Sequence, residues 1–485
     1  MTVKTGSEYL ASLRDDREVW MQGERIEDVT EAPGLARGAH TLASFIDKQH
    51  EEAHRDLLTY EEDGERHPIS FLMPRSADDV RRRGTAFYEW ARWSNGMFGR
   101  TPDYKNASVV AFAGAADFLN EGGEQAARGI DFAANMRNYY QAARHADLAL
   151  THTLVNPQFN AERVKEGLSS PEVALQAVRE TDAGVIVNGA RLLATLGPLA
   201  NDIEVFPSTL LKAAEANIPF ALAFTIPIAT PGIRLICRDT YDGGKSAFDA
   251  PLASRFEEMD AVVVFDNVLV PWERLFMYRD PLLCNRAFAE TNAVVHMMHQ
   301  VAWGKLAKAE FIVGLLCAMA HASGKDKDMN VKGQIAEAMW VAETVRALLF
   351  AAEQQPERDR WGLWIPQRRP LDTSRNLFPR LYPKLVETVQ LLGSSSLMAT
   401  PCEADFSGAI ADDVERYFEL TNLGAKDRVA LFRLAHDVAI SGFGNRQVLY
   451  ERFFFGPQNI MASIYYDLYD KDEMMDRVTA LLNQA

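Results

Sequence analysis

The sequence lacks the residues from which several kinds of site are built. Its 485 residues contain four cysteines, and no two of them stand at the spacing of a zinc knuckle, a redox CxxC motif or a clustered iron–sulfur motif. We therefore predict no metal site, and we interpret Cys237, Cys284, Cys317 and Cys402 as isolated, reduced thiols of a cytoplasmic protein.

Positive charge and long apolar runs are also scarce. The chain has 51 Lys and Arg against 67 Asp and Glu, which gives a formal net charge of -16 and argues against nonspecific binding to nucleic acid or anionic lipid. The longest apolar run, FIVGLLCAMA from Phe311, is too short to span a bilayer, and the N-terminal stretch has no apolar core of a signal peptide. The sequence thus predicts no nucleic-acid partner and no membrane association.

Two nucleotide-binding motifs are missing as well. The chain contains no GxGxxG after a predicted strand and no GxxxxGK[ST]. Nothing in the sequence therefore resembles a dinucleotide fold for NAD(P)H or a phosphate loop for ATP.

What the chain does contain is a composition typical of globular proteins, 47% hydrophobic and 24% charged. The spacing of its apolar residues changes twice along the chain, between the period of helices and that of strands. We predict a mainly helical domain over 1–150, an antiparallel β domain over 151–275, with a turn at Asn188–Gly189, and a helical bundle domain over 276–485. The last part holds four long helical patterns, which favour a four-helix bundle, and one Pro-rich connector over 354–374.

The stretch FGRTPDYKN begins a predicted helix and contains two residues that a helix start does not require. Thr101 suits the N-cap, Pro102 the first helical position, and an acidic residue at 103 the positive end of the helix dipole. Arg100 and Tyr104 remain unexplained. An arginine at such a place is more often a solvated surface residue than a functional one.

Two histidines are candidates for a partner of these residues. His152 lies in an apolar run, where a hydrogen-bonded structural histidine is the commoner explanation. His145 is a weaker rival in the preceding helical pattern. The residue patterns alone leave both interpretations open.

Several motifs carry a family resemblance. The order of helical, β and four-helix regions is that of the acyl-CoA dehydrogenase-like flavoproteins, an α+β fold. The stretches LTHTLVNPQFN, GARLLATLGPLANDIEVFPST, FDNVLVPWERLF and RLAHDVAISGFGNRQVLYERFFFG resemble the oxygenase component of the two-component 4-hydroxyphenylacetate 3-monooxygenases. This family also includes halophenol and coumarate-type hydroxylases, and the resemblance covers nearly the whole chain.

The resemblance implies an enzyme that hydroxylates a phenol. A separate NAD(P)H:flavin reductase would supply FADH2, which would react with O2 to give C4a-hydroperoxyflavin. The hydroperoxide would then hydroxylate a para-substituted phenol at its ortho carbon, and the product would be a catechol. It also implies a homotetramer. The para substituent of the phenol stays open, and so does the choice between a 4-hydroxyphenylacetate-like phenol and a halophenol.

The resemblance also assigns residues to the site. Arg100, Tyr104 and His152 would hold the phenol oxygen as its phenolate, because a cation and neutral donors favour that anion over the neutral form. Ser208 and Thr209 would form the other wall of the substrate site. The residues that it assigns to flavin binding are His152, Thr153, Leu154, Gln158, Asn160, Thr195, Gly444, Asn445, Arg446 and Gln447.

Three other kinds of protein remain as alternatives. An acyl-CoA dehydrogenase-like enzyme would hold its FAD tightly and use a carboxylate base. A 4-hydroxybutyryl-CoA dehydratase would need several cysteines near the flavin for its iron–sulfur cluster, and residues 90–160 contain none. A non-catalytic helical scaffold would have no use for the FPST and GFGNRQ motifs together.

Overall fold

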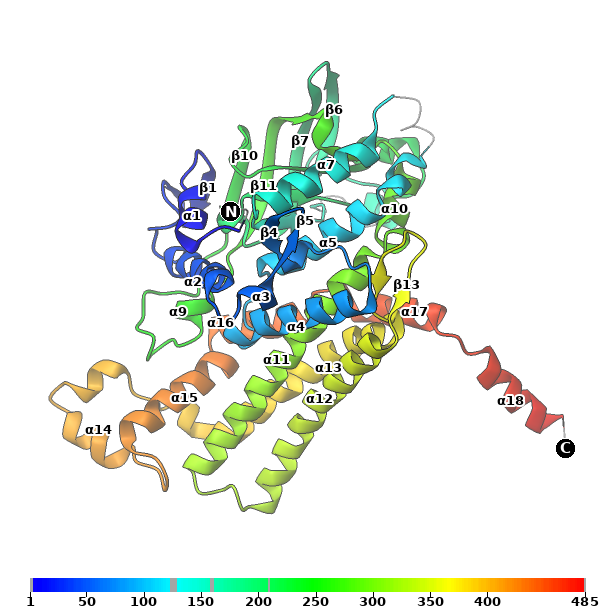
Figure 1. Cartoon of the computed structure of the whole chain (residues 1–485). Helices are drawn as coiled ribbons and strands as arrows, with labels where there is room; N and C mark the ends of the chain where they lie inside the picture. The colour runs from blue at the N-terminus through cyan, green and yellow to red at the C-terminus, as the bar shows by residue number, and fades with distance from the viewer. Residues whose placement is uncertain (1–2, 123–128, 158–160, 208–209, 484–485) are drawn as a thin grey trace.

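The computed structural model describes residues 3–122, 129–157, 161–207 and 210–483 (Figure 1). Helices, then strands, then long helices follow one another in the predicted order. The N-terminal elements are α1 (Gly6–Ser12), β1 (Glu18–Met21), β2 (Glu24–Ile26), α2 (Ala36–Asp47), α3 (Arg55–Leu58), β3 (Thr59–Glu62), β4 (Glu65–Pro68), α4 (Ala77–Trp93), α5 (Pro102–Gly114) and α7 (Phe132–His145).

Two sheets form the middle of the molecule. Their strands are β5 (Leu150–Thr153), β6 (Gln176–Thr181), β7 (Gly184–Thr195), β8 (Asp202–Val205), β9 (Leu222–Pro227), β10 (Ile233–Cys237), β11 (Asp260–Pro271) and β12 (Leu275–Tyr278), with the short helices α8 (Ala161–Lys165) and α9 (Ala253–Phe256) between them. The strand orders are β2-β1-β10-β11-β7-β6 and β12-β9-β8-β5. Pairing is antiparallel except between β1 and β10 and between β5 and β8, so β1 and β2 of the N-terminal segment belong to the central sheet.

The predicted turn at Asn188–Gly189 is wrong. Strand β7 runs through both residues and pairs with β11 on either side, with a register shift between Phe265 and Val268. Gly189 has a φ of 120°, and a Cβ atom there would lie 2.4 Å from the carbonyl oxygen of Ala174. The glycine therefore serves a bulge that another backbone segment crosses closely, and not a hairpin.

The C-terminal region is helical around one central helix. Its elements are α10 (Pro281–Glu290), α11 (Ala293–Ala322), α12 (Met329–Gln354), β13 (Glu357–Arg358), β14 (Trp364–Ile365), α13 (Arg368–Gly393), α14 (Ala411–Tyr417), α15 (Ala425–Ala439), α16 (Gly442–Phe453), α17 (Gln458–Leu468) and α18 (Asp472–Leu482). Helices α11, α12 and α13 pack side by side, and α13 also contacts α15 and α16 (Figure 1). This arrangement confirms the predicted acyl-CoA dehydrogenase-like α+β architecture with a C-terminal helical bundle.

The predicted connector over 354–374 is shorter than expected. A hairpin of β13 and β14 occupies its first half, and α13 already begins at Arg368. Pro370 lies in the first turn of α13, where its missing N–H costs no hydrogen bond. The prolines that suggested a loop are therefore compatible with a helix start.

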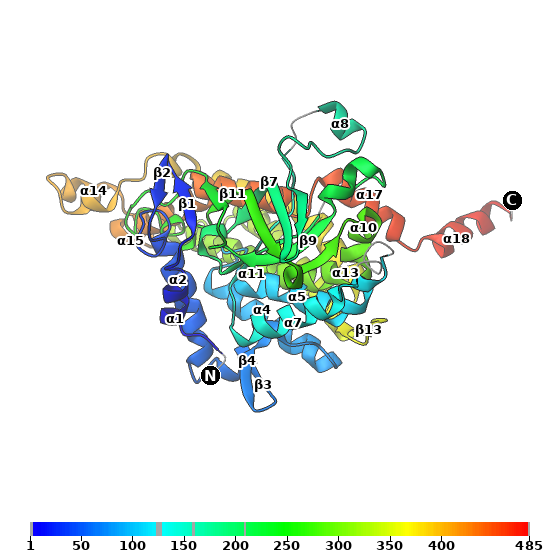
Figure 2. The same ribbon diagram turned by 90° about the horizontal axis from the view of Figure 1, so that it is seen from above.

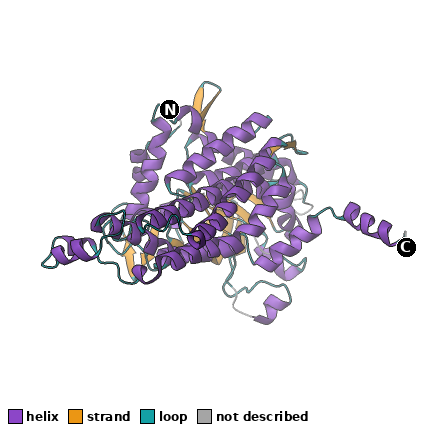
Figure 3. Cartoon of the chain, turned by 90° about the horizontal axis from the view of Figure 1, so that it is seen from below, coloured by secondary structure: helices purple, strands orange, loops and turns teal. Residues whose placement is uncertain are grey.

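Helix α5 lies in the interior, between the strands and the C-terminal helices. It packs on α11, α7 and β5 and is buried on nearly every side. Figure 2 shows α4, α5 and α7 next to the strands, and Figure 3 shows helices covering the strands from below. Among the described residues, none of the helices is long and apolar enough to cross a bilayer.

Candidate active site

Arg100 is buried where α5 begins. Thr101 is the N-cap residue of this helix and Pro102 its first residue, as predicted. The backbone N–H of Arg100 donates to Glu258 Oε1 at 2.6 Å, and only 9% of the residue is exposed. The interpretation of this arginine as a solvated surface residue is therefore wrong.

The Arg100 guanidinium is held between aromatic rings. Its central carbon lies 4.1 Å from the ring centroid of Tyr104 and 4.2 Å from that of Phe454. Its Nη1 donates to the hydroxyl oxygen of Tyr450 at 2.8 Å, while its Nε is buried without a partner among the described residues. Because no described carboxylate pairs with the guanidinium, its positive charge is available to an anion.

His152 lies against this group from the sheet side. It belongs to β5, and its ring centroid is 5.7 Å from that of Tyr104. Burial, and then the positive charges of Lys105 and Arg100, hold the pKa of His152 well below its usual range. The imidazole is therefore neutral, so one of its nitrogens can accept a hydrogen bond from a phenol hydroxyl.

Tyr104 completes the group. Burial raises the pKa of its phenol above the usual value, so its hydroxyl stays protonated and able to donate. The structure thus brings Arg100, Tyr104 and His152 together. It places His145 at the end of α7, with 65% of its side chain exposed and its Nδ1 3.4 Å from Glu65.

The residues predicted to contact the flavin from β5 and β7 lie next to this group. Thr153 donates its hydroxyl to the carbonyl oxygen of Leu192 at 2.9 Å, and Thr195 donates its hydroxyl to Asp260 Oδ1 at 2.6 Å. Leu193 and Leu196, on either side of Thr195, have φ values of 63° and 59°. Leucine rarely adopts such left-handed conformations, and strain of this kind concentrates at functional sites.

Leu154 is half-buried at the end of the same strand segment. Its carbonyl oxygen accepts a hydrogen bond of 2.7 Å from Arg191 Nη1. Four other predicted residues, Gln158, Asn160, Ser208 and Thr209, lie outside the described residues. Their roles remain predictions.

The GFGNRQ motif begins α16, which packs against the Arg100 loop. Arg446 pairs with Asp260 at 2.8 Å and with Glu258 at 2.7 Å. Gln447 donates to the carbonyl oxygen of Met97 at 2.9 Å. Hydrogen bonds and ion pairs within the chain therefore satisfy the Arg446 and Gln447 side chains without a flavin. Their role in flavin binding stays a prediction.

The other two residues of the motif differ in exposure. A Cβ atom at Gly444 would lie 2.1 Å from the carbonyl oxygen of Val438, so only glycine permits the close crossing of α15 and α16. Asn445 is exposed, and its amide donates to the carbonyl oxygens of Ile440 and Ser441 at 3.0 Å.

Sequence reasoning missed three residues of the site. Tyr450 of α16 and Phe454, the residue that follows this helix, contact Arg100, and Glu258 accepts its backbone N–H. Arg446, Tyr450 and Phe454 follow one another at intervals of four, which places them on one face of the helix. This period was the available signal, but it does not tell which residue the face meets.

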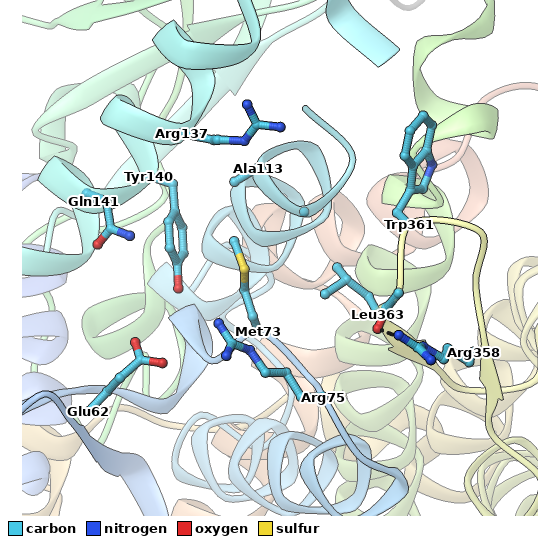
Figure 4. A pocket seen from close by; sticks show the side chains of 12 residues that line it. Glu62, Met73, Arg75, Ala113, Arg137, Tyr140, Gln141, Arg358, Trp361 and Leu363 are labelled. Atoms are coloured by element: carbon cyan, nitrogen blue, oxygen red, sulfur yellow. Dashed lines mark hydrogen bonds between the residues drawn. The ribbon is translucent and has the colours of Figure 1, made fainter. Parts of the chain in front are cut away.

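A cavity of about 430 Å³ opens at the other end of α5 (Figure 4). Ala113 and Gly114 of α5 line it, together with Tyr140 of α7. The other lining residues are Glu62, Met73, Arg75, Arg137, Gln141, Arg358, Trp361, Gly362 and Leu363. Tyr104 lies about 14 Å along the helix axis from this end. None of the residues predicted for the active site lines this cavity.

Comparison with known proteins identifies the family of the chain. The profile of the 4-hydroxyphenylacetate 3-hydroxylase N-terminal domain matches residues 5–277, and that of the C-terminal domain matches residues 284–483. The 4-hydroxyphenylacetate 3-monooxygenase oxygenase component of Thermus thermophilus is 44% identical over 99% of this chain and 98% of the relative.

Solved structures show the same fold. The oxygenase component of a 4-hydroxyphenylacetate 3-monooxygenase, complexed with FAD and 4-hydroxyphenylacetate, matches with a TM-score of 0.94 and 44% identity over 99% of this chain and 98% of that one. An archaeal 4-hydroxybutyryl-CoA dehydratase from N. maritimus shares the fold with a TM-score of 0.88, 99% and 95% coverage and 16% identity. The chain belongs to the oxygenase-component family of the 4-hydroxyphenylacetate 3-monooxygenases.

Proposed function

We propose that the chain is an FADH2-dependent monooxygenase that ortho-hydroxylates a para-substituted phenol, with 4-hydroxyphenylacetate as the first candidate. The observation that carries this proposal is that the buried Arg100 cation, the un-ionised hydroxyl of Tyr104 and the neutral imidazole of His152 converge at the start of α5. Arg100, Tyr104 and His152 offer one charge and two neutral groups to a single small volume. An anionic phenolate is the substrate form that such a volume stabilises.

Each residue has a distinct task toward the phenol. His152 accepts the hydroxyl proton through the free lone pair of its neutral imidazole, a transfer that its lowered pKa opposes and the charge of Arg100 beside the phenol oxygen favours. Arg100 balances the negative charge that remains on the phenol oxygen, and Tyr104 donates a hydrogen bond to it. The phenolate donates more electron density to its ortho carbon than the phenol does, so these three residues prepare the ring for attack.

The chain also offers residues that fit a flavin. Reduced FAD, when bound, supplies the chemistry that activates O2 and delivers one oxygen atom. Arg100 Nε is buried and unpartnered in the described part of the chain, which is typical of a site that a ligand completes. Thr195 donates its proton to Asp260, so its oxygen is left to accept a hydrogen bond from the flavin edge.

The remaining flavin contacts belong to the same proposal. Thr153 and Leu154 would hold the flavin from β5, with Gln158 and Asn160 beyond them, and Ser208 and Thr209 would face the substrate. The start of α16, Gly444–Gln447, would meet the diphosphate or adenine end. The aromatic rings of Tyr450 and Phe454 keep water from the oxygen-transfer site.

The experiment that tests this function supplies the reducing power separately. The purified chain, mixed with a flavin reductase, FAD, NADH and 4-hydroxyphenylacetate, should form a catechol that carries one additional oxygen atom. Without the reductase, the chain should not oxidise NADH, because it contains no nicotinamide-binding motif. Oxidation of NADH by the chain alone would contradict the two-component assignment.

We further propose that the chain assembles as a homotetramer. Most apolar residues of α11 are buried inside the chain, so this helix offers little apolar surface to another copy. Helix α17 packs against α13 and helix α18 projects from the body (Figure 1), and neither contains a buried residue. Their exposed apolar residues are Ile460, Ile464, Tyr466, Leu468, Met474, Met475, Val478, Leu481 and Leu482. A second copy of the chain that covers α17 and α18 would remove this apolar surface from water.

A further inference from the structure

A buried ion pair lies directly behind His152. Lys105 of α5 places its Nζ 2.8 Å from Glu204 Oε2, and the two side chains are 3% and 2% exposed. The hydroxyl of Ser108, one turn further along α5, donates to the carbonyl oxygen of Lys105 at 2.9 Å and lies 3.4 Å from the same carboxylate oxygen. The assigned roles of Arg100, Tyr104 and His152 make no use of these three residues.

Glu204 is the direct neighbour of His152 in the sheet. Strands β5 and β8 run parallel, and His152 and Glu204 are partners in their register. Paired strands are about 4.8 Å apart, and paired residues project their side chains on the same face. His152 and Glu204 are therefore neighbours on one face of the sheet, and in this structure no hydrogen bond or ion pair joins their side chains.

Each of these two side chains has a buried atom without a partner. Glu204 Oε1 and His152 Nδ1 form no hydrogen bond with any described residue. A carboxylate oxygen accepts hydrogen bonds, and one nitrogen of a neutral imidazole donates. Buried polar atoms in proteins are nearly always paired, so two complementary ones on neighbouring residues require an explanation.

We propose that Glu204 positions His152 during the reaction, with Oε1 moving to accept a hydrogen bond from the Nδ1–H of the imidazole. This bond fixes the tautomer in which Nε2 carries the free lone pair and faces the phenol. The phenol proton then moves to Nε2, and the phenolate stays paired with the Arg100 guanidinium. The carboxylate stabilises the resulting imidazolium without taking its proton. The inference rests on the proposed hydroxylation and adds Glu204 to it as a positioning residue.

Lys105 keeps the carboxylate ready for this role. Burial raises the pKa of Glu204, and the direct contact with the Lys105 ammonium opposes that shift and favours the ionised form. Because Lys105 occupies Oε2, the other oxygen remains for His152. The charged or titratable groups that surround His152 are Arg100, Tyr104 and Lys105 from the start of α5 and Glu204 from β8.

A double-mutant cycle tests the proposal. Glu204→Gln removes the carboxylate charge, and its rate of product formation is compared with that of the unmodified chain and again in a His152→Ala background. Loss of one charged hydrogen bond predicts a fall of roughly 10- to 100-fold in the first case. In the His152→Ala background we expect less than about a twofold change, since the group on which Glu204 acts is gone.

Two further variants keep the test decisive. Lys105→Met combined with Glu204→Gln removes both charges together, leaves no buried ion unpaired, and should lose activity to the same extent as Glu204→Gln alone. Glu353→Gln is the matched control, because Glu353 Oε1 bonds His299 Nε2 at 2.6 Å in another buried His–carboxylate pair. This control should lower thermal stability and leave the rate per folded molecule unchanged.

A spectroscopic measurement reads the proton directly. 4-Nitrophenol is bound anaerobically with reduced FAD, and its yellow phenolate is quantified at fixed pH. The doubly substituted protein should bind less of it as phenolate than the unmodified protein does. Equal phenolate fractions, or equal rate losses with and without His152, would overturn the role of Glu204. Absence of hydroxylation by the unmodified chain would instead refute the proposed function.

Discussion

Replacing Arg100 by methionine separates the chemical role of its charge from its packing. Methionine keeps much of the aliphatic stem and removes the guanidinium, which lies 4.1 Å and 4.2 Å from two ring centroids and bonds Tyr450 at 2.8 Å. Each cation–π contact contributes about 0.5 to 2 kcal/mol. We therefore expect the free energy of unfolding to fall by about 1 to 3 kcal/mol, a loss that a protein of this size tolerates.

The effect on the reaction should be larger than this loss of stability suggests. Without the cation the phenol oxygen loses a charged hydrogen bond, which contributes about 1.5 to 3 kcal/mol and corresponds to roughly 10- to 100-fold in rate. Oxygen consumption should continue, since FADH2 still reacts with O2, but the oxygen should appear as hydrogen peroxide. His152→Ala should divert oxygen in the same way.

The assay measures catechol and hydrogen peroxide together under a constant supply of FADH2. Tyr450→Phe is the matched control, because it removes the hydroxyl that accepts the Arg100 hydrogen bond and leaves the guanidinium in place. It should lower the product yield by less than Arg100→Met does. If Arg100→Met folds and still couples oxygen use fully to hydroxylated product, then Arg100 does not stabilise the phenolate, and the site has been assigned wrongly.

Three further predictions concern single features of the structure. Tyr104→Phe removes one neutral donor and should reduce the rate less than Arg100→Met; a larger loss would mean that Tyr104 takes part in proton transfer. Burial raises the pKa of Asp103 to about 6. Since the unfolded value is about 4, the folded state is destabilised as pH rises from 4 to 6, by about 3 kcal/mol in full above pH 6. Asp103→Asn should therefore raise Tm at pH 8 and not at pH 4, and equal gains at both pH values would contradict this. Removal of residues 457–485 should shift the assembly in sedimentation velocity to a smaller species, whereas a full-length chain that is monomeric at micromolar concentration would exclude the homotetramer.

The sequence predicted the elements that depend on residues close together in the chain. Helix α5 begins at Thr101 and Pro102 as expected, because capping depends on residues that are adjacent in the chain. The Asn188–Gly189 pair misled the prediction, since its conformation depends on the distant Ala174 backbone. Local patterns could not reveal that contact.

The same difference between local and distant contacts decided how much of the site could be predicted. Arg100, Tyr104 and His152 were predicted from a family resemblance, and the structure brings them together. Tyr450 and Phe454 were missed because their role depends on how α16 packs against a loop far away in the sequence. The Lys105–Glu204 pair was missed because each residue taken alone is typical of a surface ion pair.

The contact between Arg100 and Tyr450 joins residues that are 350 positions apart in the chain. A ribosome that adds about 5 to 20 residues per second needs roughly 20 to 70 s to synthesise the intervening segment. During that interval the nascent chain already carries the start of α5 but not the aromatic side chains that hold its arginine. The active site is therefore among the last parts of the molecule to form, and a truncated translation product would contain most of the fold without a finished catalytic centre.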